Sequence, residues 1–178
     1  MSYQRSTSID ATQEDVKPKF KEGQFVYPDE DQEKIQERLN IYLTKDDISS
    51  RAAFNGSKVS YIEGWKTFQI ANEIFGFNGW STSILNTSVD YLDVIDGRFS
   101  VGISSLVRVT LKDGSYHEDI GYGMMENSKS KGAAFEKAKK ESVTDAVKRA
   151  LRYFGNSLGN CLYDKGFLKA SSKATTGV

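Results

Sequence analysis

The segment of residues 129–159 constrains the fold most, because its apolar residues recur at helical spacing and predict one long amphipathic helix. One side of that helix would carry the apolar residues Phe135, Val143, Ala146, Val147, Ala150, Leu151 and Phe154. The opposite side would carry the basic residues Lys137, Lys140, Lys148 and Arg152, with Arg149 at its margin. Lys139 would project toward the apolar side, so we expect it to snorkel, to pair with an acid or to contact another subunit.

The positive charge of the chain is concentrated in this predicted helix. Residues 129–152 include eight Lys or Arg and three acidic residues, whereas the 178 residues as a whole have 24 basic and 24 acidic residues. Taken alone, the basic side is most simply a solvated helix face. A basic face of this kind can also lie along an anionic polymer, so nucleic acid is the alternative.

Three segments rich in β-branched and aromatic residues precede the helix: 80–95, 99–111 and 115–123. Asp-Gly pairs at 96–97 and 113–114 are two-residue hairpin signals, so they predict a three-stranded antiparallel meander. The order β-β-β-α then predicts an α+β domain in which the helix covers one face of the sheet. The edges of such a small sheet must be covered, and a ring of subunits whose sheets meet edge to edge would cover them.

One face of the middle strand is predicted to be buried, with Val101, Ile103, Ser105, Val107 and Val109 on it. Short helices are predicted from Pro28 and over residues 61–75, with a loop over 48–58 between them. Residues 1–26 are predicted to be a disordered arm, 27–170 one domain, and 171–178 a disordered tail, because the two ends are polar and lack periodicity.

The sequence shows no catalytic constellation, so we predict a protein that is not an enzyme and that needs no cofactor or metal. Cys161 is the single cysteine and His117 the single histidine, which excludes a disulfide framework and a cysteine zinc site. A metal-dependent nuclease remains a weak alternative, resting on the carboxylates Asp90, Asp93, Glu118 and Asp119.

Basic residues interleaved with aromatic ones favour single-stranded nucleic acid instead, since cations follow phosphates and aromatic faces stack on bases. The interleaved residues begin at Arg51, Phe54, Lys58, Tyr61 and Trp65. Most aromatics are expected in the core: Trp65, Phe68, Phe75, Phe77, Trp80 and Phe154. Tyr61 is balanced between core and stacking, because it follows the basic loop.

Three long segments carry a family resemblance: YIEGWKTFQIANEIFGFNGWS (61–81), VRVTLKDGSYHEDIGYG (107–123) and FEKAKKESVTDAVKRALRYFGNSLGNCLYDK (135–165). They closely resemble the Rad-fifty-two family of eukaryotic single-strand annealing and recombination mediator proteins, and the resemblance covers residues 27–169. It implies the β-β-β-α fold and a homo-oligomeric ring of about ten or eleven subunits. It also implies ATP-independent annealing of complementary single-stranded DNA in homologous recombination and double-strand break repair, in the nucleus.

The resemblance also assigns DNA-binding residues. An inner groove for single-stranded DNA would be formed by Arg51, Tyr61, Lys148, Arg149 and Arg152. An outer site, which could also take double-stranded DNA, matches Arg98, Lys129, Lys165 and Lys169, and we add Lys131, Lys137 and Lys140 to it. Arg98 stands where the family commonly has lysine, which keeps the charge but changes the geometry of a phosphate contact.

Family members continue well beyond this domain, into segments that bind the Rad-fifty-one recombinase and the single-strand binding protein RPA. Because this chain ends at Val178, those contacts are expected only if a longer C-terminal region exists. The alternative to an annealing protein is therefore a short paralogue that acts as an accessory partner of a full-length family member.

Overall fold

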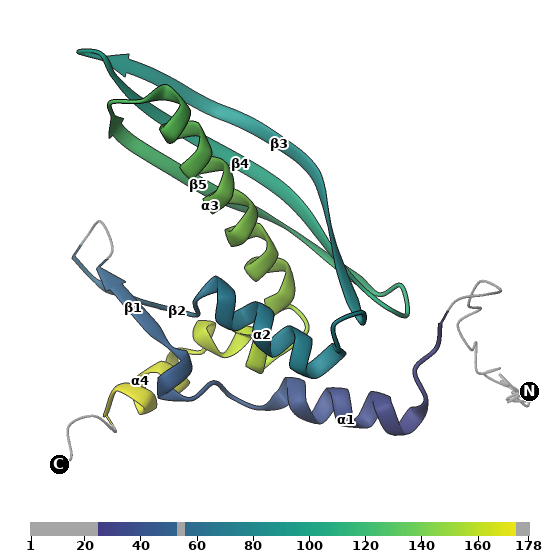
Figure 1. Ribbon diagram of the computed structural model, residues 1–178. Coiled ribbons are helices and arrows are strands. Elements are labelled where there is room, and N and C mark those ends of the chain that lie inside the picture. Colours follow the sequence, from purple (N-terminus) through teal and green to yellow (C-terminus); the bar gives the residue numbers. More distant parts are fainter. Residues whose placement is uncertain (1–24, 53–55, 174–178) are drawn as a thin grey trace, which may run out of the picture.

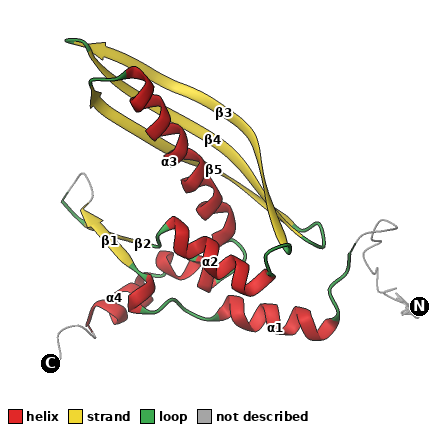
Figure 2. Cartoon of the chain, in the orientation of Figure 1, coloured by secondary structure: helices red, strands yellow, loops and turns green. Residues whose placement is uncertain are grey.

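The computed structural model describes residues 25–52 and 56–173, and it confirms the predicted α+β architecture. Strands β3 (Trp80–Ile95), β4 (Arg98–Leu111) and β5 (Tyr116–Ser128) form an antiparallel sheet in that order. Helix α3 (Lys131–Arg152) runs along one face of this sheet, and the shorter helices gather beneath it (Figure 1). Helices and strands thus occupy two layers over most of the sheet (Figure 2).

The two hairpins form where the Asp-Gly pairs predicted them. Asp96 and Gly97 have φ angles of 49° and 71°, the left-handed pair that a tight hairpin turn requires. Gly114 in the second turn also has a positive φ, of 86°. Strand β5 continues past its predicted end at Gly123 to Ser128.

Helix α3 approaches the sheet closely, because both surfaces carry small residues. Ala134, Ala138, Ser142 and Ala146 are fully buried at four-residue intervals along the helix. Opposite them on β5, a Cβ atom added to Gly121 would lie 2.0 Å from the backbone nitrogen of Ala146. The glycines of this segment therefore allow two backbones to lie nearly in contact.

The C-terminal half of α3 buries larger side chains. Val147 and Leu151 pack in a core with Leu39 of α1 (Asp29–Asn40) and Phe75 of α2 (Gly64–Phe75). The buried face therefore rotates along the helix, from Ala134 and Ala138 under the sheet to these larger residues. Lys139 lies beside the small-residue face and is exposed, which resolves the conflict that its predicted position raised.

The helix is shorter than predicted, because it ends at Arg152 and not at residue 159. Gly155 follows at a position where an added Cβ would lie 2.5 Å from the carbonyl oxygen of Leu39, so the chain turns against α1 there. Two short 3-10 helices come next, η2 (Asn156–Leu158) and η3 (Asn160–Tyr163), and then α4 (Lys165–Lys173).

The prediction of a loop over residues 48–58 is wrong, because most of this segment belongs to a hairpin. Strands β1 (Ser49–Ala52) and β2 (Lys58–Tyr61) pair antiparallel after the short 3-10 helix η1 (Lys45–Asp47). Each strand has four residues and is mostly exposed, so neither shows the alternation by which a half-buried strand is recognised. Tyr61 consequently ends a strand, and α2 begins only at Gly64.

Two of the aromatics predicted for the core are exposed. Trp65 is 66% exposed because it lies on the side of α2 opposite the buried Thr67 and Ala71, and Phe77 is 88% exposed in the turn after α2. Phe75 is buried as predicted, whereas Phe68, Trp80 and Phe154 are partly buried against the same core.

Residues 1–24 and 174–178 of the two terminal segments predicted to be disordered lie outside the described residues, as does Phe54, whereas residues 171–173 of the predicted tail belong to α4. No helix within the described ranges is both long enough and apolar enough to cross a membrane.

Candidate nucleic-acid interface

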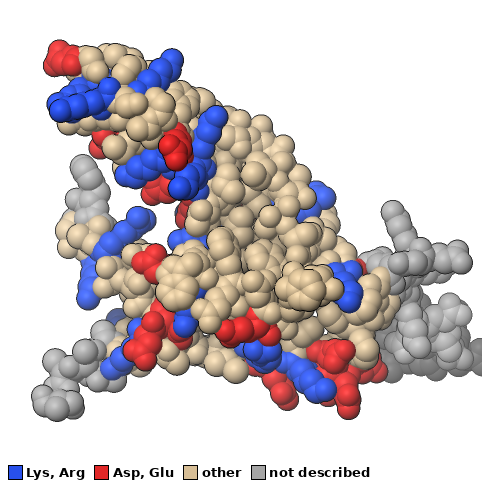
Figure 3. All heavy atoms as spheres, viewed as in Figure 1, with Lys and Arg blue, Asp and Glu red and all other residues tan. Residues whose placement is uncertain are grey.

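A groove of about 1020 Å³ separates the β1–β2 hairpin from helix α3. In Figure 3 the molecule is hollowed between its upper part and the hairpin region, with basic side chains on both sides and acidic ones among them. The groove is lined by all five residues expected at the inner site: Arg51, Tyr61, Lys148, Arg149 and Arg152. Residues almost a hundred positions apart in the sequence are thus brought to one surface.

Tyr61 lies at the centre of this group. Arg51 and Tyr61 share a face of the hairpin, since Arg51 pairs with Val59 and Ser49 with Tyr61, and the Arg51 Cζ atom is 5.6 Å from the Tyr61 ring centroid. The Lys148 Nζ atom approaches the same ring from α3, at 5.7 Å. The Tyr61 ring therefore has two cations within the distance of a cation–π contact.

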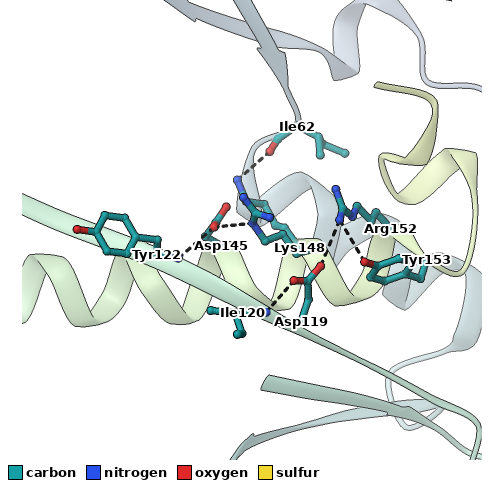
Figure 4. Close-up of polar contacts among 9 residues, drawn as sticks. Ile62, Asp119, Ile120, Tyr122, Asp145, Lys148, Arg152 and Tyr153 are labelled. Atoms are coloured by element: carbon teal, nitrogen blue, oxygen red, sulfur yellow. Dashed lines mark hydrogen bonds and ion pairs between the residues drawn. The ribbon is translucent and has the colours of Figure 1, made fainter. Parts of the chain in front are cut away.

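Hydrogen bonds fix this arrangement. The Tyr61 hydroxyl donates to Glu63 Oε1 at 2.8 Å, and this bond is the main cause of a raised Tyr61 pKa. The Lys148 ammonium donates to the backbone oxygen of Ile62 at 3.4 Å, which links α3 to the end of the hairpin (Figure 4).

Both arginines of α3 are paired with carboxylates. Arg149 Nε donates to Asp145 Oδ2 at 2.9 Å, and Arg152 Nη2 donates to Asp119 Oδ2 at 3.2 Å (Figure 4). Burial lowers the pKa of each guanidinium, but hydrogen bonds and nearby acids outweigh burial and raise it overall. Arg152 is further held by the Tyr163 ring, whose centroid lies 4.3 Å from its Cζ atom.

Two lysines expected at the outer site, Lys137 and Lys140, line this same groove. Both are exposed, and no ion pair among the described residues involves Lys137, Lys140 or Lys148. An anion could meet these three ammonium groups without displacing a carboxylate, and the same holds for Arg51, which also lines the groove and takes part in no ion pair among the described residues.

The other residues expected at the outer site lie away from the groove. Arg98 starts β4, lines a second hollow with Asp96 and Glu126, and donates to the backbone oxygen of Asn127 at 3.3 Å. Lys129 and Lys131 are exposed where β5 leads into α3, and Lys165 and Lys169 are exposed on α4. The structure therefore groups them in separate places.

The groove is mixed in charge. Its six basic residues are accompanied by four acidic ones, Glu63, Glu136, Glu141 and Asp145. Its affinity for a polyanion thus depends on which cations the acids pair with, as well as on the number of cations.

Three of the four carboxylates behind the nuclease alternative have partners of their own. Asp90 accepts a hydrogen bond from Ser104 at 2.9 Å, Glu118 pairs with Arg108 at 2.5 Å, and Asp119 pairs with Arg152. Within the described part of the chain, no group of three or more His, Cys, Asp or Glu residues is arranged to hold a metal ion.

The single histidine and cysteine have structural surroundings. The His117 ring packs on Tyr153 and Phe154, with centroids 5.4 and 4.7 Å away. Cys161 is a free, buried thiol in a core with Leu43 and Ile62, and burial raises its pKa. Neither residue lines the groove.

Sequence comparisons agree with the resemblance. The model of the Rad52/22 family of double-strand break repair proteins matches residues 31–177. The DNA repair and recombination protein RAD52 of Candida glabrata is 57% identical over 139 residues, which are 78% of this chain and 28% of that protein. RAD52 of Saccharomyces cerevisiae is 55% identical over 141 residues, or 79% of this chain and 30% of that protein.

A fission yeast relative gives the same result. The DNA repair and recombination protein rad22 of Schizosaccharomyces pombe is 53% identical over 156 residues, which cover 85% of this chain and 33% of that protein. The chain therefore spans about a third of the length of these relatives or less.

Proposed function

Because this chain belongs to the Rad52/22 family of double-strand break repair proteins, we propose that its groove binds single-stranded DNA and that the protein anneals complementary strands without ATP. The observation that carries the proposal is the convergence of Arg51, Tyr61, Lys148, Arg149 and Arg152 on one groove. Residues 27–170 would then be the annealing and oligomerisation domain, acting in the nucleus in homologous recombination.

The cations of α3 would contact the phosphates. Lys148, Arg149 and Arg152 belong to the last turns of one helix and follow one another along the groove. Tyr61, flanked by Arg51 and Lys148, offers the aromatic face on which a base or sugar can rest. A strand held by its backbone keeps its bases free to test a complementary strand, which is the requirement for annealing.

Phosphate contacts carry no base information, so binding should be independent of sequence. Neutralising several phosphates releases counterions, so affinity should fall steeply as salt concentration rises. Arg149→Ala should weaken binding to all sequences by a similar factor, and a loss confined to some sequences would contradict the phosphate role.

A homo-oligomeric ring is part of the proposal. Strand β3 is an edge of the sheet and carries exposed apolar residues: Ile84, Leu85, Val89, Leu92, Val94 and Ile95, each 38–69% exposed. Association with a second copy would bury such an edge, and a closed ring of about ten or eleven copies would leave none of these edges open. Contacts with a recombinase or RPA are proposed only for a protein with a longer C-terminal region.

The deciding experiment measures annealing of two complementary labelled oligonucleotides without ATP or metal. Wild type is compared with Lys148→Ala/Arg149→Ala, and light scattering sizes both proteins. Annealing by a large wild-type oligomer, lost in a variant of unchanged size, supports the proposal. A wild-type oligomer that does not anneal contradicts it and favours the accessory paralogue. Cleavage of the DNA after magnesium is added would favour the nuclease.

A further inference from the structure

The outward edge of β5 is closed by carboxylates along the groove. Its backbone N–H groups at Ile120, Tyr122 and Met124 donate to Asp119 (2.7 Å), Asp145 (3.2 Å) and Glu141 (3.4 Å) respectively. An edge strand usually leaves such groups to water or to a pairing strand. Here three successive outward amides are occupied by side chains.

Two of these carboxylates also hold the groove arginines. Asp145 Oδ2 accepts both the Tyr122 amide and Arg149 Nε, at 3.2 and 2.9 Å. Asp119 uses both carboxylate oxygens, because its Oδ1 accepts a hydrogen bond from the Ile120 amide and its Oδ2 accepts one from Arg152 Nη2. Each carboxylate therefore joins the sheet edge to one guanidinium of α3 (Figure 4).

We infer that Asp119 and Asp145 are positioning residues that fix Arg152 and Arg149 for phosphate binding by anchoring each guanidinium to the β5 edge. The inference rests on the proposed DNA-binding function. Each ion pair uses one guanidinium nitrogen, Nε of Arg149 or Nη2 of Arg152. The remaining N–H groups stay available for the planar contact with phosphate that arginine makes.

The two anchors differ in strength. The Arg152–Asp119 pair is 17% exposed on each side, and the Tyr153 hydroxyl and Tyr163 ring also contact Arg152. The Arg149–Asp145 pair is 42% and 32% exposed, so Arg149 depends more on its carboxylate. Loss of the anchor should therefore affect DNA binding more at Asp145 than at Asp119.

The alternative is that these acids weaken DNA binding by neutralising the positive charge of the groove. The two roles predict opposite changes in DNA affinity when an acid is removed. Asp145→Asn keeps an oxygen for the Tyr122 amide but removes the charge that holds Arg149. If Arg149 then occupies its binding orientation for about a fifth of the time, the dissociation constant for DNA should rise about fivefold, by the reciprocal of that fraction. If Asp145 only neutralised the groove, the same variant would instead tighten DNA binding.

The test measures fluorescence anisotropy of a labelled oligo-dT with wild type, Asp145→Asn, Arg149→Ala and the double variant. Glu136→Gln is the charge control, because Glu136 lines the same groove and takes part in no ion pair among the described residues. We expect Asp145→Asn to weaken binding, Glu136→Gln to tighten it, and Asp145→Asn to cause no further weakening once Arg149 is alanine.

Each outcome decides the inference. Asp145→Asn binding as tightly as wild type, or an equal loss when Arg149 is already alanine, would overturn it while leaving the proposed function intact. A wild type that does not bind oligo-dT would overturn the proposed function and the inference together. If Asp145→Asn does not fold, Asp119→Asn with Arg152→Ala decides by the same comparison, with a smaller expected loss.

Discussion

The two halves of α3 are packed by opposite means. Its N-terminal half packs Ala134 and Ala138 against the sheet, with the Ala138 backbone close to Gly123 of β5, whereas its C-terminal half also inserts Val147 and Leu151 among large side chains of α1 and α2. The first contact requires small side chains, and the second requires large ones. Added volume should therefore harm one half and removed volume the other.

The largest effect is expected from removing volume in the C-terminal half. Leu151 is fully buried, so Leu151→Ala should lower the free energy of unfolding by about 2–5 kcal/mol through lost burial and the cavity left behind. Urea unfolding followed by circular dichroism, at fixed protein concentration, measures it. Ile41→Ala is the control because Ile41 is 61% exposed, and equal losses in the two variants would contradict the contrast.

Adding one methyl group tests the other half. Gly123→Ala places a Cβ 2.1 Å from the Ala138 carbonyl oxygen, so unfolding free energy should fall by about 1–3 kcal/mol as the helix is forced away from β5. The same substitution at Gly132, where the nearest atom is 3.9 Å away, should be neutral or stabilising by up to about 1 kcal/mol. Thermal unfolding of both variants checks the difference, and similar losses would refute close approach at Gly123.

A smaller effect is expected from the buried hydroxyl contact between α3 and β4. The Ser142 and Ser105 hydroxyls lie 2.8 Å apart, so Ser142→Ala should cost about 1 kcal/mol of unfolding free energy. The double variant Ser105→Ala/Ser142→Ala should cost less than the sum of the single ones, since no buried partner is left unpaired. Additive losses would mean that the two hydroxyls do not interact.

The smallest effect concerns the groove, which both halves line. Lys140→Ala in the N-terminal half should weaken oligo-dT binding by about two- to threefold and reduce the salt slope by about one, as expected for one phosphate contact. Lys34→Ala on α1 is the matched control, because Lys34 is exposed and pairs with Glu30 at 3.6 Å. Anisotropy titrations at several salt concentrations would contradict a groove role for Lys140 if the two variants behaved alike.

The sequence predicted the parts of the fold that depend on local signals. The Asp-Gly turns and the alternation of Val101 to Val109 define β3, β4 and their pairing. Both signals come from residues that are close together in the sequence. The β1–β2 hairpin was missed, because short exposed strands have no such pattern. The end of α3 was also missed, since it depends on the contact of Gly155 with Leu39, far away in the sequence.

The candidate site was predicted by resemblance more than by pattern. Helical spacing identifies the basic side of α3, but only the fold brings Arg51 and Tyr61 beside it. The anchor at Asp145 has a readable signal, because it precedes Arg149 by four positions on the helix. Asp119 has none, since its pairing with Arg152 depends on how α3 crosses β5. The small-residue stripe at Ala134, Ala138 and Ser142 also has a local signal, because small residues recur there every four positions.

The stripe of small residues has a mechanical consequence. Because Ala134, Ala138, Ser142, Ala146 and Ala150 recur every four positions, a shift of α3 by one repeat, about 6 Å along its axis, would again place a small residue opposite a glycine. The packing of these small residues alone thus hardly distinguishes the two positions. The polar contacts of Ser142, Glu141 and Asp145 do, because none of them survives the shift, so they fix the position of the helix along the sheet together with the packing of Val147 and Leu151.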